Sequence, residues 1–200
     1  MPAGTAASTP AQTVTSALDE VLASVSACRF LLATDPAALR ELADARVRPL
    51  LDVLFAGQII LGKWWPEASA AERRAFADGL YGSLANEYAP SLLLLTPGTV
   101  TVHAAPAATG SDAVVPIVVR VPGYAPVTVS LQLRRTADRW RVYDGRVEDL
   151  SPVLQLRERF SEEIRRDGLV RVIDRLEAEA ARNRASSPIT RKCLAAGSGS

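Results

Sequence analysis

Residues 55–76 read FAGQIILGKWWPEASAAERRAF, and this stretch decides how the chain folds. From residue 50 to Trp65 apolar side chains occur on almost every side, which is typical of a helix buried on several sides at the centre of a core. Pro66 ends that helix because proline has no amide hydrogen to donate. Ser69 and Glu72 then have the spacing of a capping box, so we expect a second helix to begin at Ser69.

The segment before this stretch predicts two further helices. Apolar residues from Val14 to Leu32 recur at intervals of three and four, which marks an amphipathic helix. Asp35 and Pro36 suit the N-cap and first-turn positions of the next helix, which Pro49 interrupts. The helix that begins at Ser69 is expected to end before Pro90 with one apolar face, formed by Phe76, Leu80, Leu84 and Tyr88.

Beyond Gly98 the apolar period changes from about 3.6 to 2, which is the period of strands. Four strands are expected, at 100–104, 114–121, 127–134 and 139–144, and the second is apolar on both faces except at Pro116 and Arg120, which suggests an inner strand. Short turn sequences join most of them, so the chain predicts an antiparallel meander with one buried face. Pro116 lies inside the second segment and predicts an irregular point there.

Two helices are predicted to close the chain. Ser151 and Pro152 suit the N-cap and first-turn positions of the first, and Gly168 ends it. Five to seven helices on one face of a four-stranded antiparallel sheet make an α+β fold with an NTF2-like layer arrangement. We expect one domain over residues 13–183, with residues 1–12 and 184–200 as flexible termini.

The composition excludes several functional classes. Hydrophobic residues make up 48% of the 200 residues, enough for one sizeable core. A net charge of +1 with only two lysines, Lys63 and Lys192, provides no basic stripe for a nucleic acid. No apolar run approaches the roughly eighteen residues that a membrane span needs. Residues 1–12 have neither the basic nor the apolar region of an export signal.

Catalytic and metal-binding constellations are scarce. His103 is predicted on the polar side of a strand, and with Cys28 and Cys193 it cannot make a standard zinc site. An oxidising compartment would permit the two cysteines to pair, and a buried thiol at Cys28 is the alternative. Asp144, at a strand end, suits either the general base of an isomerase-like enzyme or a structural cap. We expect no metal and no cofactor, and we assign no catalytic residue.

Two sequence blocks carry a resemblance to a known family. The first is 61–65 followed by Phe76, and the second is 140–144 followed by Glu148, Ser151 and Gly168. Together with the order of the elements between them, they resemble the MlaC/toluene-tolerance family of periplasmic lipid carriers over roughly residues 14–180. Asp149 departs from the family pattern, which usually has glycine there, and this departure bears on the shape of the pocket rim near Leu150.

The resemblance implies a non-enzymatic periplasmic carrier that holds phospholipid acyl chains in an apolar pocket and leaves the headgroup at its mouth. The implied partners are an inner-membrane ABC transporter with its MCE-domain subunit and an outer-membrane lipoprotein complex, which together maintain outer-membrane lipid asymmetry. A hopanoid or other polycyclic lipid is an alternative ligand, and an isomerase-like enzyme using Asp144 is an alternative function. The residues expected to bind lipid are Phe55, Ile59, Ile60, Leu80, Tyr81, Leu84, Tyr88, Ile117, Val119, Val129, Leu131, Val142, Leu150, Phe160 and Ile164.

Overall fold

The computed structural model describes residues 8–105, 108–137, 139–182 and 184. Before the sheet come α1 (Pro10–Thr34), α2 (Pro36–Leu42), α3 (Val53–Leu61) and α4 (Ala70–Tyr88), with short helical turns at Ala43–Val47, Arg48–Leu50, Gly62–Trp64 and Ala89–Leu94. The strands are β1 (Val100–Val102), β2 (Asp112–Val119), β3 (Val127–Thr136) and β4 (Arg139–Val147). Two helices, α5 (Pro152–Asp167) and α6 (Leu169–Ala181), follow. The expected α+β class is therefore confirmed.

The helix starts follow from local capping. Ser69 and Glu72 form the predicted capping box, with the Glu72 amide donating to Ser69 Oγ over 3.2 Å and the Ser69 amide donating to Glu72 Oε2 over 2.8 Å. The Asp35 carboxylate accepts from the Ala37 amide at the start of α2, also as predicted. A second capping box, made by Thr9 and Gln12, starts α1 at Pro10. The first helix thus begins before the domain boundary expected at residue 13.

The expectation of one helix from residue 50 to Trp65, buried all round, is wrong. The helical part is α3, and it ends at Gly62, whose φ of +52° no residue inside an α-helix adopts. This positive φ favours glycine, and a Cβ at Gly62 would in addition lie 2.9 Å from the exposed Arg157 guanidinium, which would have to shift. Leu54 is 46% exposed, so one side of α3 faces solvent.

The predicted meander is confirmed, with the strand order β1-β2-β3-β4 and every neighbouring pair antiparallel. The register of β2 with β3 runs unbroken through Pro116, so the irregular point predicted there is absent. The irregularity lies between β3 and β4, where Leu133 pairs with Val142 and Gln132 pairs with Asp144. Tyr143 is therefore the extra residue of a β-bulge.

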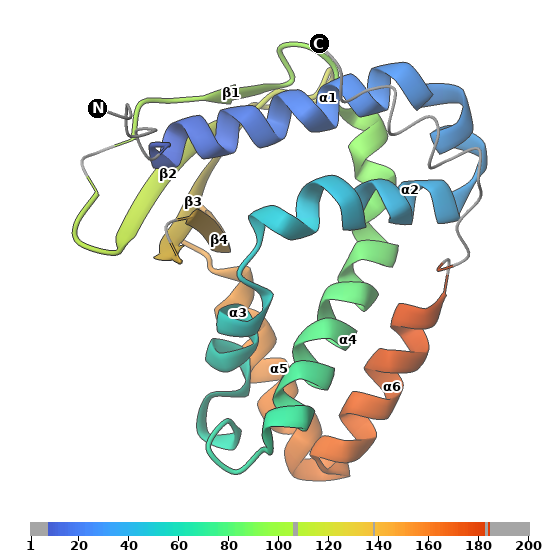
Figure 1. Cartoon of the computed structure of the whole chain (residues 1–200), viewed down its shortest axis with the longest axis vertical. Helices are drawn as coiled ribbons and strands as arrows, with labels where there is room; N and C mark the ends of the chain where they lie inside the picture. The colour runs from blue at the N-terminus through green and yellow to red at the C-terminus, as the bar shows by residue number, and fades with distance from the viewer. Residues whose placement is uncertain (1–7, 106–107, 138, 183, 185–200) are drawn as a thin grey trace, which may run out of the picture.

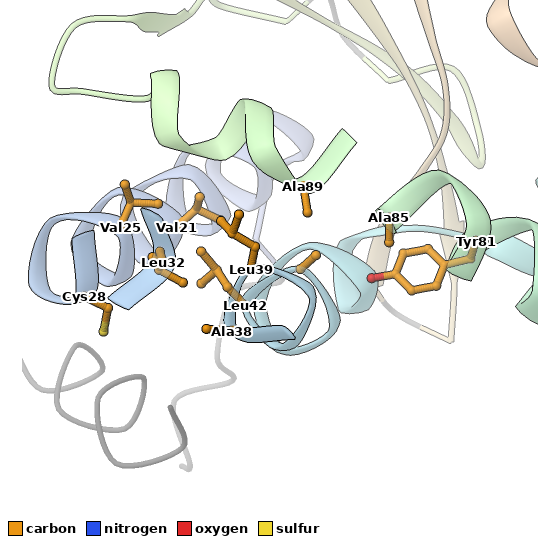
Figure 2. Close-up of a cluster of buried hydrophobic side chains, with 11 residues drawn as sticks. Val21, Val25, Cys28, Leu32, Ala38, Leu39, Leu42, Tyr81, Ala85 and Ala89 are labelled. Carbon is orange, nitrogen blue, oxygen red and sulfur yellow. The ribbon is translucent and has the colours of Figure 1, made fainter. Parts of the chain in front are cut away.

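The helices divide into two groups around the sheet. Figure 1 shows α1 lying across the sheet and α3, α5 and α6 together beyond the end of β4, with α4 running from this group up toward α1. Val14 of α1 packs on the sheet residues Val115 and Leu133. Two other clusters of buried hydrophobic side chains make up the rest of the core. One joins α1, α2 and α4 (Figure 2), and the other, around Phe76 and Phe160, lies among α3 to α6. The sheet and the α3–α6 group meet at β4, and this junction is where a pocket lies.

Candidate functional site

An apolar pocket of about 210 Å³ lies between α3, α4, α5 and β4. Its wall is mostly aliphatic, and residues 142–145 of β4 form the side that belongs to the sheet. The amide of Asp52 donates to the Val142 carbonyl over 2.8 Å, which fixes the start of α3 against β4. The lining residues are Leu51, Asp52, Val53, Ala56, Ile60, Leu80, Tyr81, Leu84, Val142, Tyr143, Asp144, Gly145, Val153 and Leu156.

The bulge in β4 shapes this wall. It turns Tyr143 toward α3, where its ring meets that of Phe55 edge to face at 5.1 Å. Burial raises the pKa of Tyr143, so the phenol is neutral at physiological pH. Gly145 follows two residues later and contributes no side chain, which leaves space between β4 and the helices. Glycine inside a strand often marks a place where a ligand approaches the backbone closely.

Tyr81 closes the pocket on the side of α2. Two guanidiniums lie near its ring, with the Arg40 carbon 5.7 Å and the Arg48 carbon 5.2 Å from the ring centre. Burial, together with the nearby Asp44 carboxylate, raises the pKa of Tyr81. The pocket is therefore lined here by a neutral phenol, and neither Arg40 nor Arg48 is among the residues that line it.

The Asp144 carboxylate accepts hydrogen bonds at the start of α5. Its Oδ2 accepts from Ser151 Oγ at 2.6 Å, and its Oδ1 accepts from the Gly145 amide at 3.0 Å and from the Val153 amide at 3.4 Å. Ser151 in turn accepts from the Leu154 amide as the helix N-cap. These bonds satisfy the buried carboxylate, which is the structural arrangement that the sequence left as one of two alternatives.

Asp149, where the family pattern has glycine, has a backbone conformation that suits glycine, and it does not line this pocket. Its φ is +67°, and that of Glu148 is +48°, so both lie in the left-handed region. This geometry gives a physical reason for a glycine at this position. Leu150 beside it is 61% exposed.

Five of the residues that the sequence suggested for lipid binding lie in this pocket, namely Ile60, Leu80, Tyr81, Leu84 and Val142. The others lie elsewhere. Ile59, Phe160 and Ile164 pack in the cluster among α3 to α6, and Ile117 and Leu131 pack against the cluster beneath α1. Phe55 contacts Tyr143, Val119 and Val129 are half-buried on the sheet, and Tyr88 and Leu150 are 58% and 61% exposed.

The sequence reasoning missed several lining residues. Gly145 carried a usable signal, because a glycine within a strand pattern indicates a bulge or a close approach. Val153 and Leu156 have the helical spacing of an apolar stripe on α5, but that spacing does not tell which neighbour the stripe faces. Ala56 gave no signal, since a small residue in a helix has no preferred environment.

Two further features of the structure bear on the class of protein. Within the residues that the structure describes, no helix combines the length and apolar character needed to cross a membrane. Nor do the described His, Cys, Asp and Glu side chains gather into a group of three or more that could hold a metal ion. Cys193 lies outside the described residues, so its pairing with the buried Cys28 stays a prediction.

Comparison with known proteins decides the family. The model of the MlaC protein family matches residues 15–178. The chain belongs to the MlaC family. The resemblance carried by residues 61–65 and 140–151 is thereby confirmed. A solved structure, that of the phospholipid-binding protein from Ralstonia solanacearum in complex with a phospholipid, superposes with a TM-score of 0.77. The two sequences are 25% identical, and the match covers 89% of this MlaC-family chain and 100% of the other.

Proposed function

We propose that this protein binds phospholipid by its acyl chains in the pocket between α3, α4, α5 and β4, and carries lipid through the periplasm. The observation that carries the proposal is the aliphatic wall of this pocket. The fold around it matches 100% of the chain in a solved phospholipid complex. Apolar cavities gain from holding hydrocarbon, because each CH₂ removed from water contributes about 0.8 kcal/mol.

The size of the pocket implies movement. Its 210 Å³ lies below the roughly 300–1,000 Å³ of pockets that enclose whole ligands. Acyl chains therefore enter only if α4 or α5 moves away from β4. Because α3 contacts both helices and β4, we expect it to serve as the fixed side of this opening.

Exchange with a bilayer has to be nearly balanced. The bilayer already removes the acyl chains from water, so a pocket that held them much more strongly could never release them. Direction then depends on partner proteins. We expect these to be the membrane complexes of the family, an inner-membrane ABC transporter with an MCE-domain subunit and an outer-membrane lipoprotein complex.

Catalysis is not part of the proposal. Asp144 is the one carboxylate in the pocket wall that the sequence offered as a general base, and its oxygens accept three hydrogen bonds at the start of α5. A group held in this way positions a helix and has no free geometry for proton transfer to a ligand.

A vesicle transfer assay tests the function. The protein is purified without detergent, and its bound lipid is extracted and quantified by mass spectrometry. It is then incubated with donor vesicles that contain labelled phosphatidylglycerol and with unlabelled acceptor vesicles. We expect about one phospholipid per chain and transfer that rises with protein concentration. Protein that contains no lipid and moves none between vesicles would refute the proposal.

A further inference from the structure

A second cavity of about 420 Å³ lies beside the apolar pocket, between α4, α5 and α6. Its character differs, since charged side chains from all three helices line it, among them Glu87, Arg159, Arg175 and Arg182. We call it the polar cleft. Neither the family assignment nor the proposed binding of acyl chains assigns it a role.

The polar cleft and the apolar pocket share one wall. Leu80 and Leu84 of α4 and Leu156 of α5 line both cavities. Leu84 and Leu156 are only half-buried, so they separate the two spaces without being locked in the core. Rotation of these side chains, or a small separation of α4 from α5, would join a charged chamber to an apolar one. A molecule with a charged end and a hydrocarbon end matches such a pair of cavities.

The arginines of the polar cleft differ in what they bind. Arg175 is fully engaged, because its guanidinium donates to Glu163 at 2.8 and 3.0 Å and to Glu179 at 2.8 Å. Arg159 and Arg182 make no ion pair with any carboxylate in the described part of the chain. Their guanidiniums can therefore donate to an anion, although the charge of Arg182 also helps to lower the pKa of Glu179 in the same cleft. Arg159 lies in the middle of α5, where its guanidinium carbon is 5.8 Å from the ring of Phe160.

We propose that Arg159 and Arg182 bind the phosphate diester of the lipid in the polar cleft while an acyl chain passes between Leu84 and Leu156 into the apolar pocket. This inference rests on the proposed function and adds the part of the ligand that is recognised by charge. Guanidinium groups suit a phosphate because their parallel N–H groups match two phosphate oxygens. The Glu87 carboxylate in the same cleft disfavours a second negative charge on the headgroup.

The experiment compares two lipids with identical chains. The full-length protein is incubated with vesicles that contain equal amounts of dioleoylphosphatidylcholine and dioleoylglycerol, then separated, and both bound lipids are quantified by mass spectrometry. The ratio of phospholipid to diacylglycerol is the readout, since a general loss of stability or of pocket volume changes both lipids alike. The wild-type ratio should favour phosphatidylcholine.

We expect Arg159→Gln to lower this ratio about tenfold, as the loss of a charged hydrogen bond would. Arg182→Gln should act in the same direction, but its charge also stabilises the last turn of α6, so its melting temperature is measured as well. Arg165→Gln, on the exposed side of α5, is the matched control and should leave the ratio unchanged.

The outcomes separate this inference from the proposed function. Recovery of both lipids with the same ratio in wild type and Arg159→Gln would overturn the phosphate site and leave the carrier function intact. Recovery of neither lipid from any variant would overturn both. Inorganic phosphate is tested separately by ³¹P NMR. Binding of the free ion that needs Arg159, with an unchanged lipid ratio, would assign the cleft to free phosphate and contradict a headgroup site.

Discussion

Gly145→Val tests whether the space beside β4 is a binding pocket or a packing defect. Gly145 lies within the strand, pairs with Leu131, and lines the apolar pocket. A Cβ built there would lie 3.5 Å from Leu131 Cδ2 and 3.6 Å from Val129 Cγ1, which are ordinary contact distances. A valine therefore fits against these two side chains and fills part of the space that acyl chains would use.

The expected gain in stability follows from two contributions. Replacing glycine inside a strand removes a conformational cost of about 0.5–1 kcal/mol. The added carbons, once buried, contribute up to about 0.8 kcal/mol each, reduced where the γ-methyls crowd their neighbours. We expect the lipid-free protein to become more stable by about 1–2 kcal/mol. Bound phospholipid should fall severalfold at the same time, because the variant occupies the volume that the ligand needs.

Urea unfolding and mass spectrometry of extracted lipid measure the two effects. Ser130→Val is the matched control, since it adds β-branching to the neighbouring strand β3 at a residue that does not line the pocket. It should leave bound lipid unchanged. Destabilisation of Gly145→Val with wild-type lipid content would show that the space is ordinary core and that the pocket is wrongly placed.

Three further predictions follow from named contacts. Asp144→Asn should lower the free energy of unfolding by about 1–3 kcal/mol in urea, because an amide replaces one of the two oxygens that accept from Ser151 and the backbone; bound lipid should persist. A turnover that disappears in this folded variant would instead support an enzyme. Asp149→Gly should stabilise the protein by about 0.5 kcal/mol in the same assay, since glycine adopts a φ of +67° without strain; a loss of stability would contradict this. The hydrogen bond from Ser83 lowers the pKa of Glu179 below its ordinary 4.5, so the stability it contributes is present above pH 4.5 and is lost as the pH falls through the lowered pKa. Glu179→Gln should reduce this loss of stability at low pH, measured by urea unfolding at several pH values. An unchanged loss would refute the role given to Glu179.

The local parts of the fold were predictable from sequence. Capping at Asp35, Ser69 and Ser151 depends on residues within one turn, and strand alternation depends on neighbours, so both can be read without knowledge of the tertiary structure. The wrong prediction of one helix over residues 50–65 also has a local cause. Gly62 ends α3 through a positive φ, which an apolar pattern on all sides conceals.

The pocket was only partly predictable because the residues that face one another across it are far apart in the sequence. Ile117 and Val129 pair with each other and therefore share one sheet face, but strand alternation does not tell which part of that face α1 covers. Arg40 is a second example. It is 2% exposed, and its guanidinium donates to the carbonyls of Gly82 and Ala180, neither of which can be recognised from the sequence around Arg40.

The central claim is that an acyl chain lies between α3, α4, α5 and β4, and photocrosslinking tests it most directly. A phosphatidylcholine with a diazirine at the end of one acyl chain is loaded from vesicles, irradiated on the protein, and the attached residue is located by peptide mass spectrometry. We predict adducts on Ile60, Leu84 or Val153, which line the pocket from three different helices. Adducts confined to the cluster around Val25 and Leu42, or to the sheet beneath α1 at Val115, would contradict the account.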